Sequence, residues 1–221
     1  MEGPAVARYP IGLAALILSG FAILGTTLVA FTHEVTRERI AENEKAAMLA
    51  NLNTLVPPEN VNNDMLSDML TVSDPELLGA DQTRVYRGRK DDQPVAVVLN
   101  TVVPDGYSGP IRLLVAVRYD GSLGGVRVLS QKETPGLGDK IELSRSDWIL
   151  GFDNKSLGHP PLGKWKVKRD GGVFDQFTGA TITPRAVVKA VKNTLLYVQA
   201  HRDALYDRTT ASDVQEKRGK S

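Results

Sequence analysis

The chain has 221 residues, of which 42% are hydrophobic and 24% are charged, so it has the composition of a folded globular protein. Lysine and arginine number 27 against 26 acidic residues, and this net charge of +1 argues against a nucleic-acid-binding protein. Cysteine is absent, which excludes disulfides, iron–sulfur clusters, thiolate zinc sites and cysteine nucleophiles. Any redox chemistry of this chain therefore needs an organic cofactor.

An apolar segment near the N-terminus has the length of a membrane span. No charged residue occurs between Pro10 and Thr32, and about 21 residues at ~1.5 Å of rise each cover roughly 31 Å, close to the thickness of the hydrocarbon core. A cleaved signal peptide would have a more basic start, a shorter apolar run and a small-x-small exit site. We therefore predict an uncleaved transmembrane helix over 10–32, preceded by a short segment 1–9.

The charges around this span leave its orientation open. One basic residue, Arg8, precedes it, and three follow soon after it: Arg37, Arg39 and Lys45. Counted literally, this difference favours a cytoplasmic position for the large domain. However, four glutamates are interleaved with the three bases, so the bias is weak.

The rest of the chain reads as a mixed domain over 33–206, followed by a flexible tail over 207–221. A helical period continues over 34–56 and ends at Pro57-Pro58, while 59–82 carries few strong signals. Strand patterns with short connections follow over 84–89, 95–103, 111–119, 126–129 and 164–169. The spacing of the turns indicates antiparallel pairing. We therefore expect an α+β fold, a twisted antiparallel sheet flanked by helices.

The last helix is predicted over 184–206. Thr183 suits the N-cap, and Pro184 suits the first helical position. The buried stripe of this helix is expected to consist of Val187, Val191, Leu195 and Val198.

The sequence gives little support for a metal site or a nucleotide-binding site. The segment 158–164 has the G-x4-G-K spacing of a phosphate loop, but Trp165 stands where the magnesium-binding Ser or Thr belongs. The three histidines lack metal-ligand spacing, so we expect no metal site, and no residue is assigned a catalytic role.

Three glycine-rich segments are the candidate functional sites. They are 104–110 (PDGYSGP), 132–140 (KETPGLGDK) and 175–184 (DQFTGATITP). The third brings small residues and threonines to the start of the last helix, where free amides and the helix dipole would stabilise a phosphate. From the residues alone, Thr181 and Thr183 could equally be simple helix caps, and the other two segments could be plain loops.

The order GYSG, KETPGLG and D-x-x-T-G-A-T resembles the FMN-binding domain of the RnfG component of the Rnf (also called Rsx) electron-transport complex. The resemblance runs from the membrane anchor to the last helix. The chain is similar, less closely, to the related FMN-binding component of the sodium-pumping NADH:quinone reductase. In this family a flavin transferase reads the D-x-x-[ST]-G-A-T segment and attaches FMN to its last threonine through a phosphoester.

The resemblance therefore implies covalent FMN on Thr181, which would make this threonine a phosphorylated residue. The implied surroundings of the attachment residue are Asp175, Thr178, Gly179 and Ala180. The implied contacts of the flavin ring are Glu133, Thr134, Gly136, Leu137, Gly138, Tyr107 and Ser108.

The resemblance also implies the role and location of the chain. It would be an electron-transfer subunit with no substrate chemistry of its own, in a complex that links ferredoxin and NAD to ion transport or reduces a redox regulator. The expected partners are the other Rnf subunits, the flavin transferase and membrane lipid. The expected location is the bacterial inner membrane, with a cytoplasmic N-terminus and a periplasmic main domain. The alternatives are the FMN subunit of a sodium-pumping NADH:quinone reductase and a membrane-anchored assembly module without redox function.

Overall fold

The computed structural model describes residues 11–207 and divides the chain into two units, one ending at Met48 and the other beginning at Leu49. The predicted N-terminal segment 1–9 and most of the predicted tail lie outside the described residues. Helix α1 (Ile11–Leu55) is continuous and ends just before Pro57-Pro58, so the apolar segment and the helix predicted after it form a single element. Within 11–207, α1 is the one helix long and apolar enough to cross a membrane.

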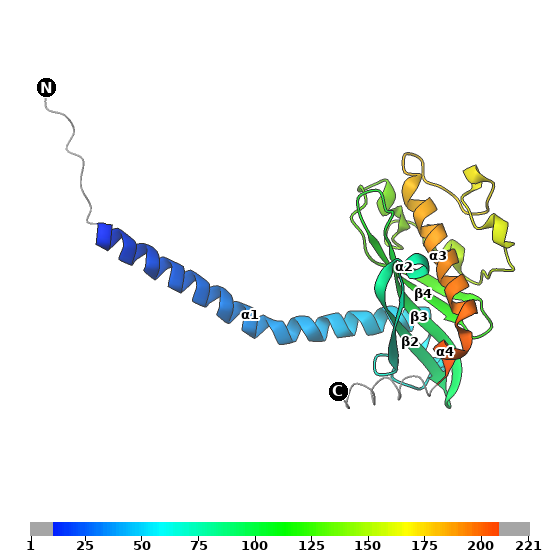
Figure 1. Cartoon of the computed structure of the whole chain (residues 1–221), viewed down its shortest axis with the longest axis horizontal. Helices are drawn as coiled ribbons and strands as arrows, with labels where there is room; N and C mark the ends of the chain where they lie inside the picture. The colour runs from blue at the N-terminus through cyan, green and yellow to red at the C-terminus, as the bar shows by residue number, and fades with distance from the viewer. Residues whose placement is uncertain (1–10, 208–221) are drawn as a thin grey trace, which may run out of the picture. The chain divides into compact units, whose positions relative to one another are not determined.

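The second unit is built on a five-stranded antiparallel sheet in which neighbours in sequence are neighbours in space (Figure 1). Its strands are β1 (Met69–Asp74), β2 (Ala80–Lys90), β3 (Gln93–Val103), β4 (Ile111–Arg118) and β5 (Leu123–Ser130). The last four overlap four of the predicted strands. The sheet is joined by α2 (Pro75–Leu78), α3 (Ile182–Ala200) and α4 (Arg202–Tyr206). The short 3₁₀ helices are η1 (Pro58–Asn60), η2 (Gly138–Ile141), η3 (Asp147–Phe152), η4 (Leu162–Lys164) and η5 (Lys168–Asp170).

Both faces of the sheet are covered, which confirms the predicted α+β architecture. Along β4, Leu113 and Val115 join the core beneath α3, and the alternate residue Leu114 is also fully buried, on the opposite face. Leu55 reaches β5 on that opposite face, where a Cβ on Gly125 would lie 2.9 Å from its Cδ2 atom. The predicted stripe of α3 is buried as expected, from Val187 to Val198.

The segment 164–169 does not form the predicted strand. It contains parts of η4 and η5, and its one strand-like contact is the isolated bridge between Val167 and Phe174. The alternation arises because Trp165 and Val167 turn into the core, where the Trp165 ring lies 5.2 Å from that of Phe174 and 6.4 Å from that of Phe152. Aromatic packing, not sheet pairing, buries every second residue here.

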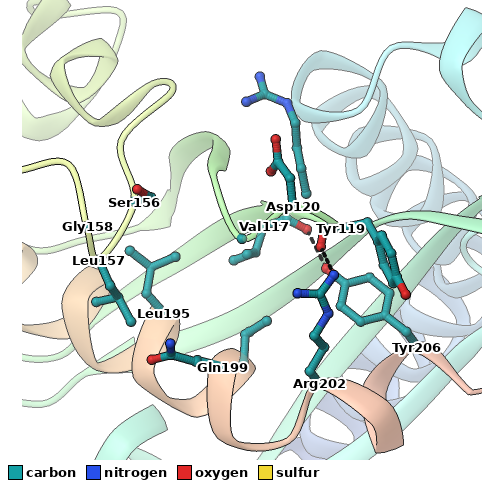
Figure 2. A pocket seen from close by; sticks show the side chains of 13 residues that line it. Val117, Tyr119, Asp120, Ser156, Leu157, Gly158, Leu195, Gln199, Arg202 and Tyr206 are labelled. Atoms are coloured by element: carbon teal, nitrogen blue, oxygen red, sulfur yellow. Dashed lines mark hydrogen bonds between the residues drawn. The ribbon is translucent and has the colours of Figure 1, made fainter.

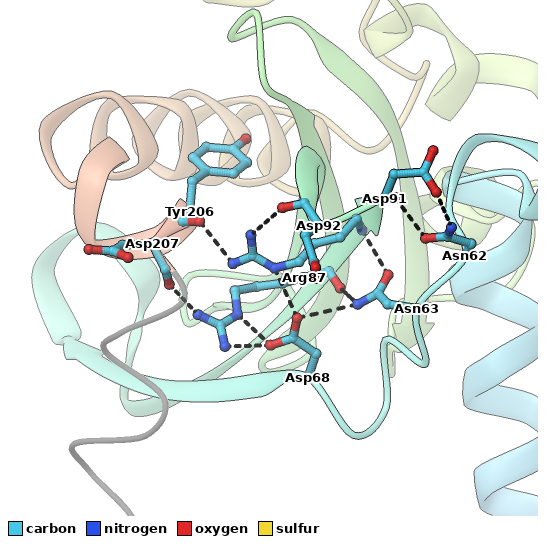
Figure 3. A network of polar contacts seen from close by, with 9 residues as sticks. Asn62, Asn63, Asp68, Arg87, Asp91, Asp92, Tyr206 and Asp207 are labelled. Atoms are coloured by element: carbon cyan, nitrogen blue, oxygen red, sulfur yellow. Dashed lines mark hydrogen bonds and ion pairs between the residues drawn. The ribbon is translucent and has the colours of Figure 1, made fainter.

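A buried polar network fixes the end of α4 against β2 (Figure 3). The guanidinium groups of Arg87 and Arg89 are almost fully buried and share the carboxylate of Asp68. Arg87 also donates to the carbonyl of Asp207 at 2.6 Å, and Arg89 donates to the carbonyl of Tyr206 at 2.8 Å. Carbonyls at a helix end lack helical partners, so each buried cation gains an acceptor that the helix leaves free.

Candidate functional site

The three glycine-rich segments meet at one open cavity of about 290 Å³. One segment connects β3 to β4, the second follows β5, and the third leads into α3. The cavity is lined by Tyr107, Glu133, Thr134, Leu137, Gly138, Gly179, Ala180, Thr181, Ile182 and Thr183. All but the last two are predicted site residues. Ile182 is not among the predicted site residues, and Thr183 is predicted only as a helix cap.

Four predicted site residues do not line this cavity. Ser108 and Gly136 belong to its loops, and Asp175 and Thr178 lie exposed on the segment before α3. Asp175 pairs with Lys168 through its carboxylate at 2.5 Å, and its carbonyl accepts a hydrogen bond from Trp148 Nε1 at 2.8 Å. These two contacts hold the side chain and the backbone of Asp175 in place.

Glu133 connects the walls of the cavity. Its carboxylate is buried, and its two oxygens accept hydrogen bonds from different segments. Oε1 accepts from the backbone N–H of Ser108 at 3.0 Å, and Oε2 accepts from the hydroxyl of Thr183. The backbone N–H of Glu133 donates to the side chain of Gln131. One side chain therefore ties the loop after β3 and the first turn of α3 to the loop after β5.

A glycine is required at position 138 because the side chains of Glu133 and Thr183 lie very close to it. A Cβ at this position would lie 2.8 Å from Glu133 Oε2 and 2.9 Å from Thr183 Oγ1, closer than real Cβ atoms approach such atoms. Gly136, two residues earlier, has a positive φ of 77°, which lets the loop turn after Pro135.

The predicted cap of α3 is wrong. The helix begins at Ile182, two residues before the predicted start, and its N-cap is Thr181, whose side chain forms no capping hydrogen bond. Thr183 lies inside the first turn, where its hydroxyl donates to Glu133 instead. The helix also ends at Ala200, and the shorter α4 follows, so the predicted helix over 184–206 is two helices.

The two threonines of this turn therefore differ in what their hydroxyls can do. Thr183 is 1% exposed and committed to a buried carboxylate. Thr181 is half-buried, lines the cavity and stands where the first amides of α3 lack helical partners. The positive end of the helix dipole favours negative charge at this point. The site can thus present one hydroxyl next to a favourable position for a phosphate.

A second cavity, of about 220 Å³, lies near the C-terminal end of α3 (Figure 2). Two of its large polar side chains, Arg202 and Tyr206, are engaged within the protein. Arg202 lies over the ring of Tyr119 and donates to its carbonyl at 2.6 Å. Tyr206 donates its hydroxyl to the carbonyl of Val117 at 3.0 Å, and burial raises the pKa of Tyr206. This cavity has the character of a structural crevice.

Comparison with known proteins identifies the family. The RnfG N-terminal region matches residues 10–55, and the FMN-binding domain matches residues 106–196. The G subunit of an ion-translocating oxidoreductase complex from Pseudomonas aeruginosa is 50% identical over 192 residues, which cover 86% of this chain and 90% of the relative. The chain belongs to this RnfG family. Others of the same name are 49% identical in Pseudoalteromonas atlantica, over 86% of this chain and 89% of the relative, and 47% identical in Erwinia tasmaniensis, over 90% and 95%.

The residues of the cavity suit the FMN that the family's domain binds. Every residue of its lining falls within the matched FMN-binding domain. Thr181 and the start of α3 suit a phosphate group, and the exposed side chains of Leu137, Ile182 and Tyr107 offer apolar surface for a planar ring. The glycine at 179, with a φ of 84°, lets the chain turn close to Leu137 just before the D-x-x-T-G-A-T segment ends.

Proposed function

We propose that this chain carries FMN through a phosphoester on Thr181 and relays electrons within a membrane-bound ion-translocating oxidoreductase of the Rnf type. The observation that carries the attachment is the contrast between the two threonines of the first turn. Thr181 lines the cavity and its side chain forms no capping hydrogen bond, whereas the Thr183 hydroxyl is buried against Glu133.

Other hydroxyl groups near the motif are less suitable acceptors. Thr178 is exposed but lies outside the lining of the cavity. Thr134 lines the cavity from the loop after β5 and is not part of the segment that leads into α3. Of these three threonines, only Thr181 both lines the cavity and is the N-cap of α3.

Attachment would be a phosphoryl transfer to Thr181. The bond between Thr181 Oγ and phosphorus forms, the hydroxyl proton passes to a base of the flavin transferase, and the bond from phosphorus to the leaving group of the flavin donor breaks. The segment that the transferase would read remains accessible, because Asp175 and Thr178 are exposed while the Trp148 contact holds their backbone. Once bound, the flavin supplies the one- and two-electron chemistry that this cysteine-free chain lacks.

The family and the apolar helix α1 support a location in the membrane. We propose a single-pass protein of the bacterial inner membrane, with residues 1–9 in the cytoplasm, a span over 10–32 and the domain over 33–206 in the periplasm. The lysine and arginine count, one before the span against three after it, points weakly to the opposite orientation, and we follow the family resemblance over it. The other subunits of the complex, the flavin transferase and lipid around the span are the proposed partners. A reporter fused to the C-terminus should be active as a periplasmic fusion, and cytoplasmic activity would refute the orientation.

The attachment is tested by intact-mass analysis of protein produced together with its flavin transferase. The wild type should gain the mass of one FMN phosphoester, and its denatured gel band should fluoresce. Thr181→Ala should lose both signals and stay folded, because its hydroxyl supports no cap. Thr194→Val is the matched control, because it removes a hydroxyl of α3 outside the motif and outside the cavity lining, and it should keep the flavin. A flavin-shifted mass in Thr181→Ala would exclude this residue as the acceptor. A colourless wild type would favour the assembly module instead.

A further inference from the structure

Glu133 is a buried acidic residue of the candidate cavity. It is 4% exposed in the wall of an open cavity, and within residues 11–207 it takes part in no ion pair. A buried carboxylate without a cation needs hydrogen bonds to offset its lost hydration. Glu133 obtains them from the Ser108 N–H and the Thr183 hydroxyl.

The N-terminus of α3 provides a second source of stabilisation. Thr183, which holds Oε2, lies in the first turn of this helix, so the carboxylate is placed at the positive end of the helix dipole. Gly138 leaves room for this arrangement, since any side chain there would displace the carboxylate or the hydroxyl. Three segments of the chain thus hold one negative charge in the wall of the cavity.

We infer that the Glu133 carboxylate lowers the midpoint potential of the flavin bound in this cavity. The inference rests on the proposed attachment of FMN at Thr181. When the cofactor takes two electrons from its donor in the complex and one proton from solvent, it gains one negative charge, and a fixed negative charge nearby opposes that gain. Little screening by water is possible for a carboxylate held inside the wall. Glu133 acts here through its charge, and Ser108 and Thr183 position that charge.

The test is the midpoint potential of the flavin in full-length protein, measured by spectroelectrochemistry on wild type and Glu133→Gln. Glutamine keeps an oxygen that can accept from the Ser108 N–H and an amide within reach of Thr183, but it removes the charge. The potential should rise by about the equivalent of a tenfold change in the reduction equilibrium, which is about 30 mV for a two-electron couple. Amide exchange at Ser108 in flavin-free protein should stay slow, showing that the position is kept.

Two further variants make the result decisive. Thr194→Val removes a buried hydroxyl of the same helix, one that contacts Thr101 Oγ1 at 3.1 Å, and it should leave the potential unchanged. Thr134→Lys brings a positive charge to the same wall from an exposed position, so it should raise the potential even if Glu133→Gln folds poorly.

Each remaining outcome bears on the inference. An unchanged potential in Glu133→Gln or in Thr134→Lys, with flavin attached, would overturn it. Loss of attachment in a folded Glu133→Gln would also overturn it, because the carboxylate would then act in flavin transfer. A wild type without covalent flavin would refute the proposed function first, and this is visible by mass before any potential is measured.

Discussion

Thr183→Val should destabilise the domain even though it leaves the volume of the side chain nearly unchanged. The substitution removes the hydroxyl that donates to Glu133 Oε2 and leaves a buried carboxylate oxygen without that donor. Hydrogen bonds to charged groups contribute about 1.5–3 kcal/mol. A domain of roughly 150–250 residues loses about 2–4 °C of Tm per kcal/mol. We therefore expect a loss of about 3–12 °C.

The assay is thermal unfolding of full-length protein in detergent, followed by circular dichroism and made without the transferase so that flavin does not contribute. Thr194→Val is the matched control, because it removes a neutral hydroxyl contact that contributes about 1 kcal/mol. Thr181→Ala should melt close to wild type. If Thr183→Val melts no lower than Thr194→Val, the contact with Glu133 does not stabilise the fold and the assignment of Thr183 as a core residue fails.

Two other substitutions test the packing of the site and the electrostatics of the domain. Gly138→Ala places a Cβ 2.8 Å from Glu133 Oε2 and should destabilise by about 1–3 kcal/mol, whereas Gly151→Ala, whose Cβ would meet nothing within 4 Å, should be nearly neutral in the same urea titration. Burial raises the pKa of Asp153 above its ordinary value of 3.8, despite the nearby Arg127 guanidinium, so the folded state disfavours its charged form. Asp153→Asn should therefore raise Tm at pH 7, and the gain should vanish as the pH falls below 3.8, where the carboxyl is protonated in both states; a gain that persists there would contradict the reasoning.

The sequence predicts the sheet and the cavity well where the signals are local. The strands β3 and β4 are rich in β-branched residues, and the glycine-rich segments mark where the chain must turn tightly or approach another segment. Strand β1 was not predicted, because it lies on the edge of the sheet and its burial alternates only between exposed and half-buried residues. Its composition gives little sign of pairing.

Thr183 shows why the rest could not be predicted. A threonine followed by proline is typical of a helix start, and this local preference placed the cap two residues too late. The residue that decides the matter is Glu133, which lies 50 positions away in the sequence and accepts the hydroxyl in the core. A single sequence does not reveal such a partner. The alternation at Trp165 and Val167 resembles that of a strand for the same reason: these residues are buried against side chains that are not their neighbours in the sequence.

The openness of the cavity explains why a covalent bond suits this site. Tyr107 is 67% exposed, Ile182 47% and Leu137 39%, so apolar contacts here can bury only part of a flavin ring. A site that encloses its cofactor can hold it without a bond, but it also places protein between the cofactor and its redox partner. An open site allows a redox partner to come close to the cofactor, but it holds the cofactor less tightly. The proposed phosphoester on Thr181 would retain the cofactor without closing the cavity, while the contacts of Glu133 keep the cavity's walls in place.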